Sequence, residues 1–377
     1  MNKNQLFVLN KGYHYGVRPL LFRFPSEAVH EALTSFGQFS GNNKIITEIL
    51  SKFFINQDNS IKQSFFGIPF VSPIGLSAGF DYRAELTQVT PVLGFGFETI
   101  GTITNYPYKG NSSPRLGRLV RSKSLLVNKG FKNEGIKKVI SKLSGKHFSI
   151  PIGLSIGRTN STALSTQKKS VEDICSAFTI AESSGIPFSY YELNISCPNL
   201  YGNISFYSKQ NLTELLRAVT KLPLAKPLFI KMPIDKTNVE IKKILHVIVG
   251  FAVSGVIFGN LQKDRKDPAL VQSEVDKYPI GNFSGKPTQK RSDELIAYAY
   301  KHFGDKLLII GCGGVFSAED AYQKIRRGAS LIQLITGLIF VGPQLICEIN
   351  CGLSELLKRD GFSHISEAIG IDVKSAS

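Results

Sequence analysis

The chain has 377 residues, of which 42% are hydrophobic and 20% charged, and its formal net charge is +16. This composition, without a low-complexity tract or a fixed-period repeat, excludes disordered and fibrous proteins and is typical of a globular domain of barrel size with an appendage. The positive charge would suit an anionic partner, such as nucleic acid, a membrane surface or a small molecule. The alternative is that the charge only forms a basic, solvated surface.

Five cysteines at wide spacings predict neither a disulfide framework nor a metal site, and the six histidines are scattered, so we expect no metal and a reducing compartment. The opening stretch "MNKNQLFVLNKGYHYG" breaks its apolar run too early for a signal peptide. The longest apolar segment, 244–261, contains His246 and Gly and Ser breaks. It predicts a helix end followed by a buried strand, not a membrane span.

Residues 1–65 differ in pattern from the rest and are predicted to form an N-terminal helical extension. The segment "FPSEAVHEALTSFG" places Val29, Leu33 and Phe36 on one helical face, and "NKIITEILSKFF" is rich in Ile and Phe. We expect two short helices separated by "GQFSGNN". The pair either docks on the main domain or dips its apolar faces into a membrane interface, where nearby Lys and Arg meet lipid head groups.

From about residue 70, short apolar runs alternate with amphipathic helical stretches. One of these stretches, "TNVEIKKILHVI", begins with a Thr237–Glu240 capping box. Eight runs alternating with helices predict a (β/α)8 barrel over residues 66–360, followed by a C-terminal tail at 361–377. The predicted strands are 72–78, 97–102, 150–157, 190–196, 227–232, 255–260, 307–314 and 331–337.

Polar residues collect where these strands end, and the carboxyl ends of barrel strands are where barrel enzymes place their chemistry. "IIGCGGV" and "LITGLIF" follow the seventh and eighth strands, where glycine turns suit a phosphate group. The residues expected at this mouth are Asp81, Thr102, Ser155, Asn194, Cys197, Asn199, Lys231, Asn260 and Thr336.

Three residue types in this set suggest a reaction. Lys231 ends an apolar strand and needs an anionic partner, for which the N1–C2=O edge of a reduced flavin or a barrel carboxylate is suitable. Cys197 is a candidate acid/base whose pKa we expect nearby dipoles to lower. The amides of Asn194, Asn199 and Asn260 suit a planar, amide-rich ring such as a pyrimidine.

These residues resemble the dihydroorotate dehydrogenases, FMN-containing barrels of pyrimidine biosynthesis. The resemblance runs from about residue 20 to 350, and the N-terminal "LFRFPSEAVHEAL" is similar to the quinone-dependent, membrane-associated class. The motifs that carry it are "SPIGLSAGFD", "GFGFETIGTIT", "SSPRLGRL", "KGFKNEG", "LSIGRTN", "NISCPN", "IKMPID", "IFGN", "FSGKP", "IIGCGGV" and "RGASLIQLITGLIFVGP".

The resemblance implies that Cys197 takes a proton from C5 of dihydroorotate while C6 gives hydride to flavin N5, and that a quinone then reoxidises the flavin. It also implies a peripheral membrane location, at the cytoplasmic face or the inner mitochondrial membrane, and no nucleic-acid partner. The implied dihydroorotate and orotate contacts are Asn128, Lys129, Gly130, Phe131, Asn194, Asn199, Asn260 and Leu261. The implied FMN contacts are Ala78, Gly79, Thr102, Ser155, Asn194, Lys231, Gly259, Gly285, Gly313, Gly314, Ile335, Thr336 and Gly337.

Several positions depart from the family pattern. The quinone-dependent class normally has Ser where this chain has Cys197, and the family lysine that touches flavin and substrate is replaced by Tyr82, with Arg83 beside it as a possible substitute for the charge. Val127 stands where the family has Asn, and Leu261 stands where a Thr is usual. Ser155 also replaces a usual Asn.

The altered substrate side leaves alternatives open. One is a flavin barrel that acts on a different pyrimidine-like ring or only binds it. Another is a tRNA dihydrouridine synthase, also an FMN barrel with a catalytic Cys, which the net charge would suit. For the leading hypothesis, fumarate as a soluble electron acceptor is a variant that Cys197 suggests.

Overall fold

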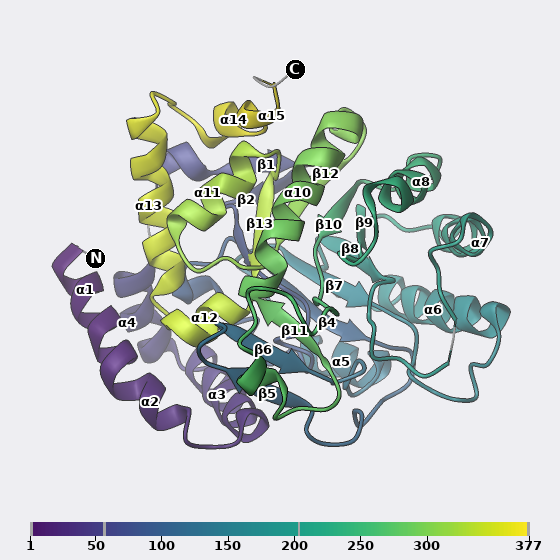
Figure 1. Cartoon of the computed structure of the whole chain (residues 1–377), viewed down its shortest axis with the longest axis horizontal. Helices are drawn as coiled ribbons and strands as arrows, with labels where there is room; N and C mark the ends of the chain where they lie inside the picture. The colour runs from purple at the N-terminus through teal and green to yellow at the C-terminus, as the bar shows by residue number, and fades with distance from the viewer. Residues whose placement is uncertain (1–2, 56–57, 203, 375–377) are drawn as a thin grey trace.

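The computed structural model describes residues 3–55, 58–202 and 204–374. At its centre is a closed barrel of eight parallel strands surrounded by helices (Figure 1). Each predicted apolar run coincides with one barrel strand to within a few residues, which confirms the (β/α)8 architecture. The strands are, in barrel order, β3 (Ile74–Leu76), β4 (Phe97–Ile103), β7 (Ile152–Ile156), β8 (Tyr190–Asn194), β9 (Leu228–Lys231), β10 (Gly255–Phe258), β12 (Leu308–Cys312) and β13 (Leu331–Leu334).

The helices outside the barrel bury one apolar face each against the strands. The Thr237–Glu240 capping box is present at the start of α8, as predicted, and segment 244–261 is a helix end followed by buried β10. These helices are α5 (Ile136–Leu143), α6 (Gln167–Glu182), α7 (Lys209–Thr220), α8 (Asn238–Ile248), α9 (Gln272–Val275), α10 (Lys286–Phe303), α11 (Ala318–Arg326), α12 (Thr336–Val341) and α13 (Leu345–Arg359), with short 3-10 turns η2 (Asn59–Ile61) and η3 (Pro91–Leu93).

Aromatic side chains fill the barrel interior at the end where the strands begin. Phe97, Tyr190 and Phe229 pack there with Phe70, which comes from the hairpin β1 (Gln63–Phe65) and β2 (Ile68–Phe70). The hairpin therefore covers the N-terminal end of the barrel, and the opposite end is left for the site.

A second, antiparallel sheet lies beside that opposite end. It pairs β6 (Ser124–Val127) with β5 (Leu116–Leu119) on one side and β11 (Asn282–Gly285) on the other. Because β6 leads into the loop of Lys129 and β11 ends at Gly285, this sheet brings both segments to the strand ends.

The N-terminal helices pack along one side of the molecule, next to α12 and α13 (Figure 1). Residues 3–21 also form helices, in addition to the two that were specified within the predicted helical extension. The predicted gap "GQFSGNN" is too long. Helix α3 continues to Gly41, and α4 begins at Lys44 with the Asn43 side chain as its N-cap. The elements are α1 (Lys3–Gly12), the π-helix η1 (Tyr13–Val17), α2 (Arg18–Leu21), α3 (Ser26–Gly41) and α4 (Lys44–Phe54).

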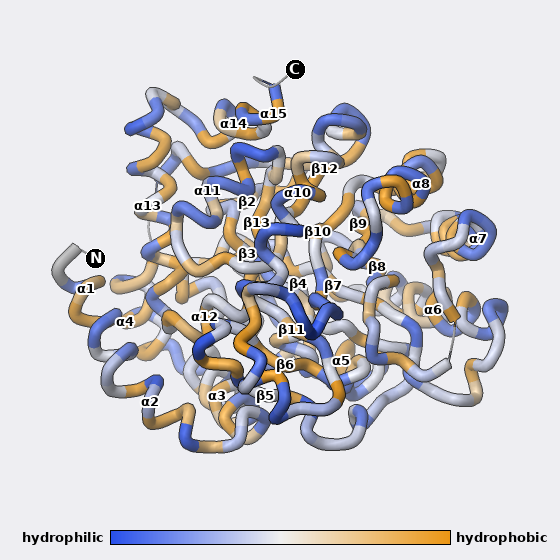
Figure 2. The backbone as a smooth tube through the Cα atoms, in the orientation of Figure 1, coloured by the Kyte–Doolittle hydropathy of each residue, from blue (hydrophilic) through white to orange (hydrophobic). Residues whose placement is uncertain are grey.

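Apolar side chains are unusually exposed on these helices. Of the 21 large hydrophobic side chains that are exposed in the described part of the chain, 14 lie between residues 3 and 55. Hydrophobic segments run along α1 to α4 in the hydropathy view (Figure 2). No helix among the described residues is long and apolar enough to span a bilayer.

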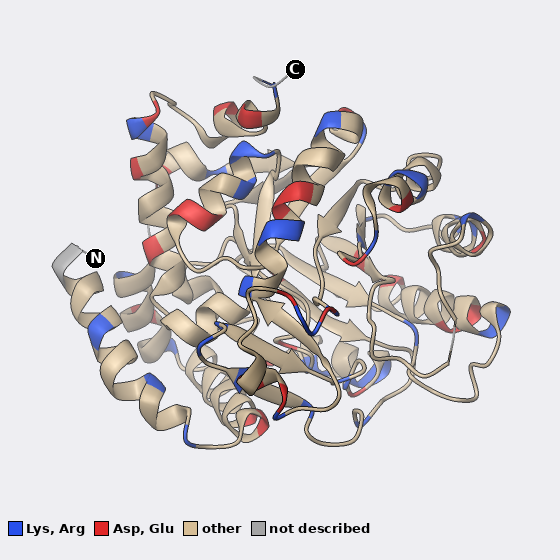
Figure 3. Ribbon diagram, in the orientation of Figure 1, with Lys and Arg blue, Asp and Glu red and all other residues tan. Residues whose placement is uncertain are grey.

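The basic residues are scattered over helices and loops on the face shown in Figure 3, as a solvated basic surface would be. Near the C-terminus, α14 (Ile365–Ala368) and α15 (Ile371–Lys374) pack on the barrel, where Asp372 pairs with Arg326 at 2.6 Å. The proposed boundaries at residues 65 and 360 remain predictions.

Candidate active site

A pocket with an empty volume of ≈ 1190 Å³ lies at the C-terminal mouth of the barrel. The structure brings nearly all of the predicted site residues to its wall; Asp81, Asn128 and Ser155 are the exceptions. The predicted residues that line it are Ala78, Gly79, Thr102, Lys129, Gly130, Phe131, Asn194, Cys197, Asn199, Lys231, Gly259, Asn260, Leu261, Gly285, Gly313, Gly314, Ile335, Thr336 and Gly337.

Two glycine-rich turns form one end of this pocket. Gly313 and Gly314 have φ values of 111° and 70°, and among the described residues the backbone N–H groups of 313–315 donate to no protein acceptor. Gly337, at the start of α12, lies so near Val315 that a Cβ there would be 2.0 Å from the Val315 carbonyl oxygen. Free N–H groups in such a turn, beside a helix start, suit a phosphate. The turns therefore fit the phosphate of FMN.

Lys231 is buried at the end of β9 and takes part in a polar network. Its Nζ donates to Ser77 Oγ at 3.0 Å and lies 3.9 Å from Glu192 Oε1. Glu192 is fully buried in β8 and also accepts from Ser155 Oγ at 2.7 Å, while its second oxygen has no partner among the described residues. Lys231 thus has a barrel carboxylate beside it, and it also lines the pocket, where a flavin would meet its ammonium.

The three asparagines are held by hydrogen bonds to neighbouring residues. Asn194 Nδ2 donates to Thr102 Oγ1 at 2.8 Å, and Asn260 Nδ2 donates to Ser196 Oγ at 2.5 Å. Asn199 Nδ2 donates to the Val127 carbonyl at 3.2 Å. These bonds fix the amide planes at the pocket wall, so a ring that enters meets oriented donors and acceptors.

Cys197 is half-buried in the loop after β8 and lines the pocket. Burial raises the pKa of its thiol to about 12, although the Asn199 backbone N–H and the charges of Arg158 and Lys263 act in the opposite direction. The prediction that dipoles lower this pKa is wrong, because the desolvation of the thiolate outweighs them.

Four residues expected at or near the site do not line the pocket. Ser155 lies beneath it, bonded to Thr102 and Glu192, and Asn128 accepts from Asn111 Nδ2 at 3.0 Å in the loop behind it. Asp81 is buried and accepts from the backbone N–H groups of residues 85 and 86. Arg83 lies 3.6 Å from Glu85, so it does not bring its charge into the pocket.

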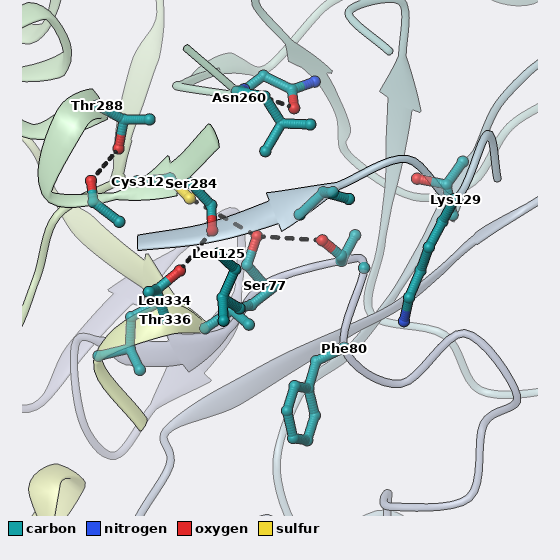
Figure 4. A pocket seen from close by; sticks show the side chains of 18 of the residues that line it. Ser77, Phe80, Leu125, Lys129, Asn260, Ser284, Thr288, Cys312, Leu334 and Thr336 are labelled. Atoms are coloured by element: carbon teal, nitrogen blue, oxygen red, sulfur yellow. Dashed lines mark hydrogen bonds between the residues drawn. The ribbon is translucent and has the colours of Figure 1, made fainter. Parts of the chain in front are cut away.

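Several pocket residues were not predicted from the sequence. Ser284 and Thr288 flank the predicted Gly285, and Ser284 Oγ lies 2.8 Å from Thr336 Oγ1 (Figure 4). The strand "SPIGLSA" contains Ser77, so its position at a strand end was a usable indication. Nothing in the strand pattern indicates His30, because it comes from α3 in the N-terminal extension.

A larger, mainly apolar cavity adjoins the pocket, with an empty volume of ≈ 2040 Å³. It lies between the N-terminal helices and the barrel and includes Val29, Leu33 and Phe36, the predicted apolar face of α3. The cavity and the pocket share part of their walls. The shared residues are His30, Phe80, Leu116, Leu125 and Ile339.

A closed barrel, a glycine phosphate cradle at its mouth and a lysine, a cysteine and three asparagines on the same wall define the class of cofactor-dependent barrel enzymes. The sequence model of the family described as "Dihydroorotate dehydrogenase" matches residues 60–357. The chain belongs to this family.

Relatives in the family have similar lengths. The chain is 36% identical over 361 residues to the "Dihydroorotate dehydrogenase (quinone)" of Sulfurovum sp. (strain NBC37-1), covering 95% of this chain and 98% of that protein. It is 37% identical over 343 residues to the protein of the same name from Synechocystis sp. (strain ATCC 27184 / PCC 6803 / Kazusa), covering 87% of each. In fold it is similar to the crystal structure of DHODH in complex with ferulenol from Eimeria tenella, with a TM-score of 0.80 and 24% identity over 92% of this chain and 96% of that one.

Proposed function

We propose that the protein oxidises dihydroorotate to orotate with bound FMN, in pyrimidine biosynthesis, and passes the electrons to a quinone. The observation that carries this proposal is the shared wall between a polar pocket at the barrel mouth and an apolar cavity under the N-terminal helices. The pocket suits a polar ring, and the cavity suits an apolar electron acceptor. Family membership supports the same reading and argues against a tRNA dihydrouridine synthase.

The glycine turns at 313–315 and 336–337 would hold the FMN phosphate, and Lys231 would face the isoalloxazine. Gly79 leaves room beside them, since a Cβ there would meet only Ile335 Cδ1, at 3.6 Å. When bound, FMN supplies the hydride acceptor for C6 of the substrate. The protein positions that substrate and handles its proton.

Cys197 is the proposed base, and it removes the proton from C5 of dihydroorotate. Asn194, Asn199 and Asn260 hold the ring by its amide groups, on the same wall as the thiol. The thiolate is the reactive form of Cys197. A bound substrate removes water from this thiolate, so the backbone N–H of Asn199 and the positive charges of Arg158 and Lys263 must stabilise it instead.

The rate of flavin reduction at saturating dihydroorotate should rise with pH, by about tenfold per unit between about pH 6 and 9. The physical reason is that the thiol pKa is raised to about 12, so the thiolate fraction grows throughout that range. Anaerobic stopped-flow absorbance across this range measures it. A rate that levels off below pH 8 would contradict a base with so high a pKa.

The apolar cavity is the proposed quinone site, and the exposed faces of α1 to α4 are the proposed membrane contact. Ile45, Ile49 and Phe53 repeat along α4 and are exposed by 70%, 50% and 43%. Such a stripe can enter the interfacial region of a bilayer without unfolding the protein. On this proposal the protein is a peripheral membrane protein.

The triple variant Ile45→Glu/Ile49→Glu/Phe53→Glu should lose most liposome binding, because three carboxylates would enter the interface. Flavin reduction by dihydroorotate should stay unchanged, since α4 does not line the polar pocket. Co-sedimentation with liposomes measures the first, and stopped-flow the second. The double variant Val239→Glu/Ile280→Glu, at exposed apolar residues elsewhere, is the matched control. Equal liposome binding by the triple variant and this control would refute the membrane contact.

The test of the whole proposal is anaerobic mixing of the flavin-loaded protein with dihydroorotate. Fast bleaching of the flavin absorbance would establish the substrate. No bleaching with FMN bound would favour the second candidate, a flavin barrel for another pyrimidine-like ring, which Val127 and Leu261 suggest because both are apolar where the family pattern has polar residues. Reoxidation by quinone and by fumarate, compared afterwards, would identify the acceptor.

A further inference from the structure

Lys129 is a half-buried lysine whose ammonium group reaches the pocket without a carboxylate partner. It lies in the loop after β6 and lines the pocket, and its Nζ sits 4.3 Å from the centre of the Tyr82 ring. Among the described residues no carboxylate lies within ion-pair distance of this Nζ. A buried ammonium that is paired only with an aromatic face has not recovered the hydration it lost. Burial accordingly lowers the pKa of Lys129 to about 7.

The nearest acidic side chains are already engaged. Glu27 accepts from Arg115 at 3.0 Å and from Lys132 at 2.7 Å, and Glu31 accepts from the same Lys132 at 2.9 Å. These pairs hold α3 to Arg115 and to Lys132, which follows Lys129 in the same loop. Both carboxylates are therefore occupied, and neither forms an ion pair with Lys129. An anionic ligand in the pocket would supply the missing charge.

The backbone of Lys129 is fixed beside the proposed ring site. Asn111 Nδ2 donates both to Asn128 Oδ1 and to the Asn199 carbonyl, each at 3.0 Å, which ties this loop to the loop that follows Cys197. Gly130 has φ of 61°, and a Cβ there would lie 2.5 Å from Asn111 Oδ1, so a larger residue would strain the turn. The side chain extends along the pocket toward Phe80 (Figure 4). The rotatable stem can therefore move the ammonium while its base stays in place.

Tyr82 completes the arrangement. It stands at the position where the family pattern has a lysine, it is buried, and its hydroxyl has no hydrogen-bond partner among the described residues. Its ring stacks on His30 at 5.3 Å. The chain thus has an aromatic ring at the family's lysine position and a lysine in contact with that ring.

We propose that Lys129 binds the carboxylate of dihydroorotate and orotate, supplying from the β6 loop the positive charge that position 82 no longer carries, with Tyr82 as the platform for its ammonium. This inference rests on the proposed function, because it names the group that recognises the substrate of that function. It assigns the implied substrate contact of Lys129 to the carboxylate group and gives Tyr82 a positioning role.

Isothermal titration of orotate into the FMN-loaded protein tests it. Lys129→Gln should raise the Kd at least tenfold, because the charge-assisted bond is lost, whereas Lys129→Arg should stay within about threefold. FMN content should be equal in both. Lys168→Gln, at an exposed lysine on α6, is the matched control and should bind as the wild type does. A second neutral variant, Lys129→Met, keeps the test informative if glutamine disturbs the loop.

Relocating the charge separates recognition from packing. In Tyr82→Lys/Lys129→Gln the ammonium returns to position 82, and orotate affinity should recover most of the loss seen in Lys129→Gln. A Kd for Lys129→Gln within twofold of the wild-type value would overturn the assignment while leaving the proposed function intact. Wild-type protein that loads FMN and gives no heat with orotate would overturn both.

The pH dependence gives a further readout. The wild-type Kd should rise above about pH 7, toward tenfold per unit, as Lys129 loses its proton, and Lys129→Arg should remove this rise. Lowered pKa values of Glu27 and His30 and raised pKa values of Lys132 and Tyr82 move those titrations away from this range. A wild-type Kd that is flat from pH 6 to 9 would overturn the assignment. The charged and titratable groups that face Lys129 are Glu27, His30, Glu31, Tyr82, Arg115 and Lys132.

Discussion

Replacing Cys197 with alanine should slow flavin reduction by dihydroorotate by about 10²- to 10⁴-fold, the range that general-base catalysis contributes. The methyl group cannot accept the C5 proton, and no other titratable side chain in the described pocket wall replaces it at the end of β8. FMN content should not change, because the glycine turns and Lys231 are untouched. Anaerobic stopped-flow absorbance, on samples matched for flavin content, measures the rate.

Cys175→Ala is the matched control, since Cys175 is a partly buried thiol on α6 that does not line the pocket. It should reduce flavin at the wild-type rate. If Cys197→Ala also reduces at that rate, Cys197 is not the base. The polar end of β8 would then have only a positioning role.

Replacing Lys231 with methionine should lower the free energy of unfolding by about 3–5 kcal/mol, the cost of leaving a buried charge unpaired. Glu192 is fully buried and would lose the ammonium 3.9 Å away. FMN retention should fall as well, because the proposed cofactor contact of Lys231 loses its positive charge. Urea unfolding and the flavin content per chain measure the two effects.

The double variant Lys231→Met/Glu192→Gln distinguishes the two roles of the lysine. It removes both charges, so stability should return toward the wild-type value, while FMN retention and flavin reduction should stay low. Recovery of both would mean that Lys231 serves only the carboxylate. Lys324→Met/Asp293→Asn removes another buried pair, 2.6 Å apart and outside the pocket wall, and should leave FMN bound.

Much of the barrel could be predicted because its indications are local. A strand that is buried on both faces needs an apolar run, and the turn that follows it tolerates glycine and polar residues. Lys231 and Asn194 are register partners on β9 and β8, so finding both at strand ends correctly placed them side by side. Glu192, two residues before Asn194 on the same strand, was missed because a carboxylate inside an apolar run looks like an interruption.

The sequence by itself determined the eight-stranded barrel, the glycine turns at its mouth and the polar wall around Cys197, since each depends on residues close together in the chain. Only the tertiary structure decided the electrostatics. Burial, which raises the Cys197 pKa, depends on every segment that packs around the loop. Likewise Arg83 pairs with Glu85. The Lys129 ammonium lies over the Tyr82 ring, which stacks on His30, so three distant segments converge there. Desolvation and pairing are set by neighbours in space, and a pattern of neighbours in sequence does not contain them.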